Sequence, residues 1–458
     1  MNRRYLALLL FLIFAGNVSF GFQIVYPKKQ SVTINSDKTF FIGNEKKCKT
    51  LKINNTAVKL HPSGGFKHVV KLDYGQNVFI IDNGEQKQTF KINRPIPAKN
   101  SSTPPQQLKA IYYENPIVII TTKENVPLRS TPVDAGLNRL QHLPFGTEFI
   151  AIGEERGFYR VKLGRDGFGF ISKDSAQKFE NSVISYANIQ YSAHKSNKDE
   201  KLVEISLDKK VPYTVSDNNS GLDIALYNID NHLYEKYEDH IVGKPFGYSS
   251  YYNNDGTLVI SMKNFPKVNP QYLLKNLKIT IDPGHGGSES GAIGCLGDKE
   301  KDINLEIAKN LRSKLEKAGA KVLMTREDDS YVGLNERVEK SNYFNADIFL
   351  SIHNNALPDS AADRDATGTE AYYFYPQSKE LANILAKSVA DKTGFKSGGA
   401  RGKSLAVVRN TQSIAVLLEV GYLINPEDNS KLINKDFQDN VTDGIIDGLE
   451  RYLKQNGI

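Results

Sequence analysis

The chain has 458 residues, a length that predicts several domains rather than one. Hydrophobic residues make up 40% of it and charged residues 24%, a balance that excludes a largely disordered chain. The net charge of +7 is mild for this length. No run of Lys and Arg gathers that charge on one element, so we expect no nucleic acid among its partners.

The first residues predict a secretory signal peptide over residues 1–22. Arg3 and Arg4 are followed by an apolar run over residues 5–15 and then by small residues. The run is shorter than the ~20 residues of a membrane span. We therefore expect an exported chain, in the periplasm or the cell-wall and extracellular space, without stable membrane insertion after cleavage. An uncleaved N-terminal anchor is the alternative.

Two cysteines, Cys48 and Cys295, are too few for a disulfide scaffold in a chain of this length. They fall in regions that we assign to different domains, which makes a disulfide between them unfavourable. We expect each to be a partly buried thiol.

Short apolar runs separated by turn residues predict a β-sandwich-like module over residues 23–94. The runs cover residues 32–34, 51–53, 68–72, 78–81 and 89–92. This pattern resembles bacterial immunoglobulin-like modules. Four prolines among residues 95–105 then mark a linker, which we place at residues 95–116.

Two further β modules are predicted before the C-terminal part. Residues 117–176 resemble a bacterial SH3-like domain, a module that often binds peptidoglycan beside wall hydrolases. The resemblance rests on the segments at 126–132, 143–147, 157–161 and 167–171. Aromatic side chains there, such as Phe158 and Phe170, also suit the core of a small barrel. Residues 177–276 are β-rich and resemble the AMIN domains of cell-wall amidases.

From residue 277 apolar runs of strand length alternate with amphipathic helical segments. Strands are expected at 277–282, 320–325, 347–352, 369–375 and 415–420. One helix carries a shared apolar face over residues 303–315 and stops at Gly319, another ends near Gly394, and a terminal helix covers 433–453. We predict an α/β domain over residues 277–458, with a mixed sheet covered by helices.

Four side chains of this domain form a candidate hydrolytic centre. His285, His353 and Glu419 lie at or near the ends of predicted strands, where open α/β sheets place their sites. Glu300 begins the first helix. A catalytic zinc takes three protein ligands and leaves one position open, and two His with one Glu is an established set. The sequence therefore predicts zinc ligation by His285, Glu300 and His353.

Each of these residues also has a purely structural interpretation. His285 could face solvent in a tight glycine turn, and His353 could follow the end of a strand. Glu300 could be an acid that stabilises a helix N-terminus. Glu419 is harder to explain in this way, because a carboxylate inside an apolar strand is costly without a partner or a task.

Residues 278–455 resemble the zinc-dependent N-acetylmuramoyl-L-alanine amidases of the Amidase_3 family. The segments that carry the resemblance are Asp282-Pro283-Gly284-His285-Gly286-Gly287, Glu300-Lys301-Asp302-Ile303-Asn304-Leu305, Ser351-Ile352-His353-Asn354-Asn355 and Leu418-Glu419-Val420-Gly421. The resemblance implies one zinc ion per catalytic domain, held by His285, Glu300 and His353, with Glu419 as the catalytic residue. Glu289-Ser290, where the family usually has Asp-Pro, departs from the pattern without touching a proposed ligand.

By the same resemblance, the enzyme cuts the amide between N-acetylmuramic acid and L-alanine of the peptidoglycan stem peptide, during wall remodelling or daughter-cell separation. We expect peptidoglycan as partner and a monomer. Two alternatives remain: a zinc peptidase acting on other exported peptides, and a non-catalytic wall-binding scaffold. All four site residues are present, which disfavours the scaffold.

The segment after the second His is short. Only a dozen residues, 356–367, separate Asn355 from Gly368, and Pro358 with three acids limits them to about one helical turn. Some division amidases carry a long insertion here, which blocks the site. We therefore expect an accessible site that needs no activator, unless an upstream module covers it.

Overall fold

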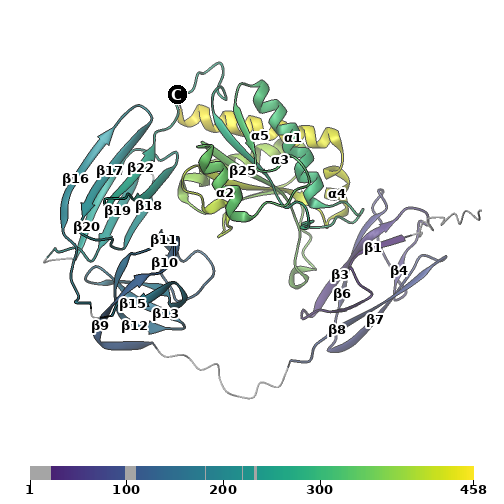
Figure 1. The fold of residues 1–458 in the computed structure, drawn as a ribbon. Helices are drawn as coiled ribbons and strands as arrows, with labels where there is room; N and C mark the ends of the chain where they lie inside the picture. The colour runs from purple at the N-terminus through teal and green to yellow at the C-terminus, as the bar shows by residue number, and fades with distance from the viewer. Residues whose placement is uncertain (1–21, 98–109, 181, 219, 232–234, 458) are drawn as a thin grey trace, which may run out of the picture.

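The computed structural model describes residues 22–97, 110–180, 182–218, 220–231 and 235–457 (Figure 1). The predicted signal peptide, apart from Phe22, and most of the predicted linker lie outside the described residues. Within the described part of the chain, no helix is long and apolar enough to cross a membrane. Cys48 and Cys295 are both free thiols.

The N-terminal module consists of two small sheets that share one core. Their strand orders are β1-β3-β6 and β2-β8-β7-β4-β5. Apolar residues from both sheets, among them Phe41, Phe66 and Ile81, are completely buried between them. The strands are β1 (Phe22–Tyr26), β2 (Ser31–Thr33), β3 (Lys38–Glu45), β4 (Lys52–Ile53), β5 (Thr56–Ala57), β6 (Gly65–Lys71), β7 (Gly75–Asp82) and β8 (Lys87–Arg94).

The next part of the chain, up to residue 263, forms a seven-stranded sheet followed by a pair of sheets. The first sheet has the order β11-β10-β14-β13-β12-β9-β15. Its strands are β9 (Ile111–Thr121), β10 (Val126–Arg129), β11 (Arg139–Leu143), β12 (Glu148–Glu155), β13 (Phe158–Leu163), β14 (Gly167–Ser172) and β15 (Ala176–Lys178), with a short helix η1 (Lys173–Ser175).

The pair of sheets has the orders β16-β17-β22-β21 and β18-β19-β20. Apolar residues of the seven-stranded sheet and of this pair belong to one continuous cluster, which includes Leu128, Val203 and Leu258. The strands are β16 (Ile189–Ser196), β17 (Glu200–Leu207), β18 (Tyr213–Asp217), β19 (Gly221–Tyr227), β20 (Lys236–Val242), β21 (Tyr248–Tyr252) and β22 (Thr257–Lys263).

The C-terminal domain has a six-stranded sheet of order β24-β23-β25-β28-β26-β27. Only the β26–β28 pair is antiparallel, so the predicted mixed sheet is confirmed. The strands are β23 (Lys278–Pro283), β24 (Lys321–Met324), β25 (Ile348–Asn355), β26 (Thr369–Tyr373), β27 (Ser397–Gly402) and β28 (Ile414–Tyr422). The helices are α1 (Glu300–Lys317), α2 (Leu334–Tyr343), α3 (Lys379–Thr393), α4 (Pro426–Leu432) and α5 (Lys435–Asn456), with short η2 (Asp359–Ala361), η3 (Pro376–Ser378) and η4 (Val407–Arg409).

Alternation along the central strands explains how helices cover both faces of this sheet. Leu350 and Ile352 of β25 join the core shared with α1, α3 and α5, whereas Phe349 points to the opposite face and packs with η4. The apolar face of α1 is buried as its spacing predicts, and α3 ends at Gly394 with φ +72°. Helix α2 and the edge strand β27 were not predicted.

The C-terminal domain extends its core into the preceding segment. Phe246 and Leu274 lie before residue 277, yet each is 1% exposed and belongs to the same cluster as Ile279 and Leu311. The Lys263 ammonium also donates to the backbone oxygen of Ala346 at 2.9 Å. These contacts fix the pair of sheets against the end of the domain.

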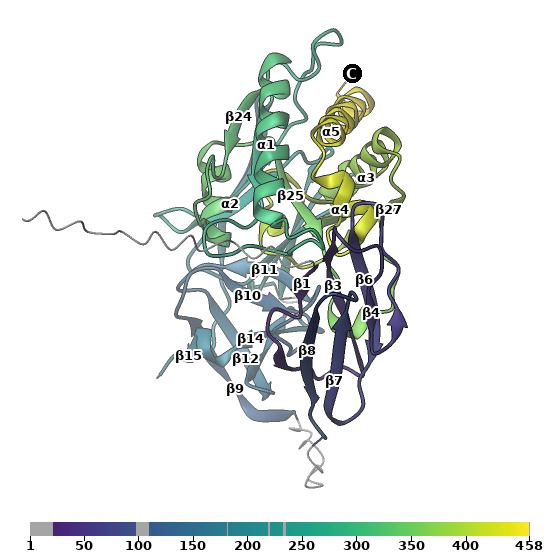
Figure 2. The same cartoon turned by 90° about the vertical axis from the view of Figure 1, so that its right-hand side faces the viewer.

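The N-terminal module packs against the C-terminal domain, as both views show (Figures 1 and 2). Phe40 and Ile42 of β3 form a buried apolar cluster with Cys295 and Ile424. At its edge, Thr39 Oγ1 donates to Asp359 at 2.6 Å. The N-terminal module therefore contacts the C-terminal domain at the loops that follow β23 and β25.

Candidate metal centre

His285 lies in a tight turn directly after β23. Its φ is +61°, which is uncommon for a residue with a side chain, and Gly286 and Gly287 also have positive φ. Two buried arginines hold the backbone of this turn. Arg326 donates to the backbone oxygens of Pro283 and Gly284, and Arg337 donates to that of His285 at 2.8 Å. The charge-assisted hydrogen bonds from the two arginines thus hold the strained turn in place.

Asp282, the next-to-last residue of β23, anchors Arg337. Its Oδ1 accepts from Arg337 at 2.7 Å and from Thr325 at 2.6 Å, and its Oδ2 accepts from Ser351 at 2.7 Å. Asp282 is 1% exposed and Arg337 is 3% exposed. A buried ion pair with its remaining positions filled by hydrogen bonds is the arrangement that avoids a large desolvation cost.

Glu300 lies between the two histidines. Its Oε2 is 3.3 Å from His285 Nε2, and its Oε1 is 2.9 Å from His353 Nδ1. Each oxygen also accepts a backbone N–H, from Ala292 at 2.8 Å and from Asn354 at 3.2 Å. The carboxylate is therefore fixed in orientation by the chain on both sides.

Gly284 and Gly291 allow the side chains of His353 and Glu300 to lie directly against the backbone. A Cβ at Gly284 would lie 2.2 Å from the ring of His353, and a Cβ at Gly291 would lie 2.4 Å from Glu300 Oε2. Neither separation is tolerated by a real side chain, and neither blocking atom can move without displacing a site residue. A side chain at either position would therefore displace a residue of the His–Glu–His group.

The group has the composition and spacing of a zinc site. One ligand atom from each of His285, Glu300 and His353 lies within 4.8 Å of the others, the sole such cluster among the described residues. Two donors ~2.0–2.1 Å from one tetrahedral zinc ion would be about 3.3 Å apart, and Glu300 Oε2 lies 3.3 Å from His285 Nε2. The chemistry and spacing of the donors therefore fit zinc, with two imidazoles and one carboxylate.

The electrostatics of the group agree with a cation-binding role. Burial alone would raise the pKa of Glu300, but its hydrogen bonds to His285 and His353 lower that pKa below its ordinary range. For His353, burial is the largest single effect and opposes the charged form, but the hydrogen bond to Glu300 together with the nearby carboxylate charges outweighs it and raises the pKa. Glu300 is therefore ionised at neutral pH, as a metal ligand must be.

Glu419 lies on β28 directly beside His353 of β25 in the parallel register. Its Oε2 is buried without a hydrogen-bond partner. Burial, together with the nearby charge of Glu300, raises its pKa to about 7. The structure thus brings the fourth predicted residue next to the other three, with one carboxylate oxygen uncommitted.

A second acid beside Glu419 was missed by the sequence reasoning. Glu370 of β26 faces Glu419 in the antiparallel register and is 6% exposed. It accepts from the Tyr372 hydroxyl at 2.8 Å, and its Oε1 pairs with Arg401 of β27 at 2.7 Å. The two residues are neighbours only because β26 pairs with β28, and the spacing of residues in the sequence does not predict that pairing.

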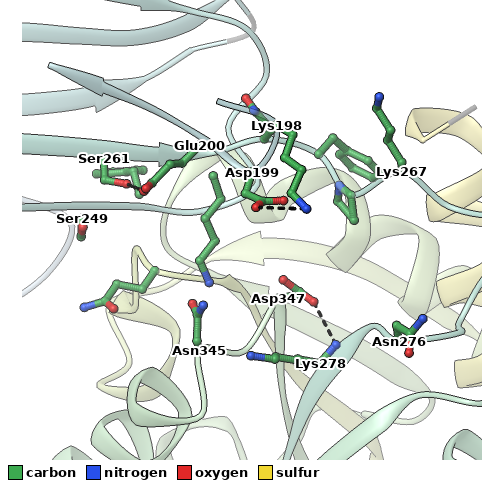
Figure 3. A pocket seen from close by; sticks show the side chains of 16 residues that line it. Lys198, Asp199, Glu200, Ser249, Ser261, Lys267, Asn276, Lys278, Asn345 and Asp347 are labelled. Carbon is green, nitrogen blue, oxygen red and sulfur yellow. Dashed lines mark hydrogen bonds and ion pairs between the residues drawn. The ribbon is translucent and has the colours of Figure 1, made fainter. Parts of the chain in front are cut away.

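The largest cavity described lies elsewhere. A polar space of about 890 Å³ separates β17, β21 and β22 from the opposite end of the C-terminal sheet, near Lys278 and Asp347 (Figure 3). Lysines and acids both line it, including Lys198, Glu200 and Lys267. None of the four candidate residues contributes to its wall, so its size does not make it the reaction site.

One protein family matches the C-terminal domain. The match covers residues 279–451, and the family is that of the N-acetylmuramoyl-L-alanine amidases. This C-terminal domain belongs to that amidase family. All four candidate residues of the amidase domain fall inside the matched range.

Curated relatives match the same region. The probable cell wall amidase LytH of Staphylococcus saprophyticus subsp. saprophyticus is 40% identical over 184 residues, which cover 40% of this chain and 60% of that protein. The probable cell wall amidase LytH of Staphylococcus aureus is 39% identical over 198 residues, 43% of this chain and 64% of that protein. The chain thus spans about three fifths of the length of these relatives.

Solved structures also match the amidase domain. The catalytic domain of the N-acetylmuramoyl-L-alanine amidase CwlV from Bacillus (Paenibacillus) polymyxa var. colistinus is 39% identical, with 39% of this chain and 98% of that chain covered and a TM-score of 0.37. An N-acetylmuramoyl-L-alanine amidase from Clostridium difficile 630 is 34% identical, with 40% and 100% covered and a TM-score of 0.38.

Proposed function

We propose that this chain is a zinc-dependent N-acetylmuramoyl-L-alanine amidase, which hydrolyses the amide between N-acetylmuramic acid and the L-alanine of the peptidoglycan stem peptide. The observation that carries the proposal is the approach of His285, Glu300 and His353 to one another beside the buried Glu419. The family match supports the bond that is cut, because the chemistry of the donors alone would suit several amide hydrolases.

His285, Glu300 and His353 would hold the zinc ion. When bound, zinc polarises the amide carbonyl and lowers the pKa of a water molecule to ~7. Arg326 and Arg337 keep the His285 turn in place, and the Asn354 and Ala292 amides orient Glu300. Such support fixes ligand orientation and tunes ligand basicity.

Glu419 would act as general base and then as general acid. Its Oε2 has no hydrogen-bond partner in the protein, so it is available to take a proton from the attacking water. A pKa near 7 lets the same group hold that proton and pass it to the departing amine of L-alanine. Its strand position keeps it beside His353, and therefore beside the bond to be cut.

The upstream modules would attach the enzyme to the wall. The two sheets of β1–β8 suit the β-sandwich predicted for residues 23–94. The seven-stranded sheet, between Ile111 and Lys178, suits the SH3-like module predicted for residues 117–176, and the two sheets between Ile189 and Lys263 suit the AMIN-like module predicted for residues 177–276. With a signal peptide over residues 1–22, the mature chain would be an exported monomer acting on peptidoglycan.

Digestion of purified sacculi with the zinc-loaded mature chain tests the proposal. We expect intact stem peptides with a free L-alanine amine and glycan strands that keep their lactyl groups. Cleavage inside the stem peptides instead would identify a peptidase. Absence of any cleavage by folded, zinc-loaded protein would favour a non-catalytic wall-binding protein.

A further inference from the structure

An apolar cavity of about 240 Å³ opens between the N-terminal module and the amidase domain. One wall comes from β1 and β3 and includes Val25, Phe40 and Ile42. The opposite wall consists of the loops that follow β23, β25 and β28, with Leu357 and Ile424 among its residues. The cavity is therefore formed by two modules that are far apart in the sequence.

The cavity adjoins the proposed zinc site. Gly291 and Ala292 line it, and the backbone N–H of Ala292 donates to Glu300 Oε2 at 2.8 Å. Ala356, which also lines it, is the third residue after His353. A group bound in the cavity would thus lie next to the reacting bond, and one substrate molecule could occupy both places.

The two walls are held together by specific contacts. The Tyr26 hydroxyl donates to Asp359 at 2.8 Å, and Thr39 donates to the same carboxylate at 2.6 Å. The Asn44 side chain donates to the backbone oxygen of Cys295 at 3.1 Å. Because Asp359 is engaged by two hydroxyl groups, the cavity offers a ligand an apolar surface, with Lys28 as its one cation among the described lining residues.

The opposite side of the site has a different character. Lys403 follows the edge strand β27, and its ammonium lies 4.7 Å from the ring of Tyr372. Arg401, on β27 itself, is paired with Glu370 at 2.7 Å. The Lys403 ammonium suits a carboxylate of a stem peptide, whereas an apolar cavity suits the acetamido methyl and the C–H face of the neutral sugar on the other side of the amide. The charge of the surroundings thus distinguishes the two halves of the substrate.

We infer that this two-module cavity binds an N-acetylated hexosamine ring of the glycan, on the acyl side of the scissile amide. The inference rests on the proposed amidase function. Ligand pockets of ~300–1,000 Å³ hold drug-sized molecules, so the smaller cavity takes one ring rather than a glycan segment. The N-terminal module would then be part of the substrate site, in addition to any role in attachment to the wall.

The test compares two substrates and two pairs of variants in the full mature chain. The substrates are N-acetylmuramoyl-tripeptide and D-lactoyl-tripeptide, which share the scissile amide and differ by the sugar ring. Ala356→Phe fills the cavity from the amidase side, and Lys28→Trp fills it from the N-terminal module. Ser360→Phe and Lys29→Trp are matched controls, because both positions are exposed and neither lines the cavity.

We expect the unmodified chain to cleave the muramoyl substrate with a higher kcat/KM than the lactoyl substrate. In both blocking variants the ratio of the two kcat/KM values should fall at least tenfold, and in both controls it should stay within twofold. All four variants should keep one zinc ion and the Tm of the unmodified chain. A preference retained in either blocking variant would overturn the inference. So would equal rates of the unmodified chain on both substrates. No cleavage of either substrate by the unmodified chain would reject the amidase function itself.

Discussion

The hydroxyl of Tyr26 lies 2.8 Å from Oδ2 of Asp359, although 333 positions separate the two residues. Asp359 begins the short helix η2, in the segment between His353 and β26. The N-terminal module therefore restrains a loop of the catalytic site. A loop held from outside its own domain should become mobile when that restraint is removed.

Replacement of Asp359 by Ala should loosen this loop, because Tyr26 and Thr39 both lose their acceptor. We expect a cost of about 1–3 kcal/mol to the local structure. Hydrogen exchange of residues 356–366 should accelerate by about tenfold or more, since ~1.4 kcal/mol corresponds to a factor of ten. Unchanged exchange would show that the apolar contacts alone fix the loop, and Asp365→Ala, which removes a neighbouring acid, serves as control.

Replacement of His285 or His353 by Ala should remove about one equivalent of zinc per chain, because each change deletes one of three proposed ligands. Metal analysis after dialysis measures this directly. His61→Ala is a suitable control, since His61 bonds to Ser63 in the N-terminal module. Full zinc content in either site variant would refute the ligand set.

Glu419→Gln should keep zinc and lose turnover by roughly 10²-fold or more, because the amide keeps the shape and cannot accept the proton. Glu300→Gln should instead lose zinc. Measurement of metal content and kcat on both variants separates binding from chemistry, and the opposite pattern would mean that the two roles are exchanged.

Arg337→Lys should weaken zinc binding, although Arg337 is not one of the proposed ligands. Lysine keeps the charge but cannot serve Asp282, Val332 and His285 together, as the guanidinium does. We expect a loss of about 2–3 kcal/mol in stability together with weaker zinc binding, because the His285 turn is released. Thermal unfolding and zinc competition titration measure the two effects. An unchanged zinc affinity would show that the His285 turn keeps its conformation without the hydrogen bond from Arg337.

His142 should make the chain sensitive to mild acid. Burial, with the nearby Arg139, lowers its pKa to about 4, so the folded state binds its proton less readily than the unfolded state. Stability is therefore lost as pH falls from ~6.5 towards 4, by about 2 kcal/mol at pH 5. His142→Gln should lose less stability between pH 7.5 and pH 5 than the unmodified chain, as unfolding curves at the two pH values would reveal. Burial raises the pKa of Asp217 to about 6, which acts in the opposite direction and is the same in both proteins.

The sequence predicted the elements that carry the site because local rules determine them. The apolar spacing of α1, the glycine that ends α3 and the apolar strands β23, β25 and β28 all follow from short-range pattern. These elements bring His285, Glu300, His353 and Glu419 close together.

Contacts that depend on strand order could not be predicted in this way. Glu370 meets Glu419 only because β26 runs antiparallel to β28, and Arg337 reaches His285 from α2, a helix too polar to show a periodic apolar face. The contact of the N-terminal module with the segment after β25 is likewise a long-range packing event. No residue pattern within either segment specifies its partner.

The burial of Phe246 and Leu274 in the amidase core has a practical consequence for protein engineering. A catalytic fragment that starts at Leu277 would leave an apolar depression where these two side chains belong. A fragment for domain exchange should therefore begin before Phe246, and should keep at least β22 with it. Recombination at the apparent sequence boundary, Asn276, would separate residues that fold as one unit.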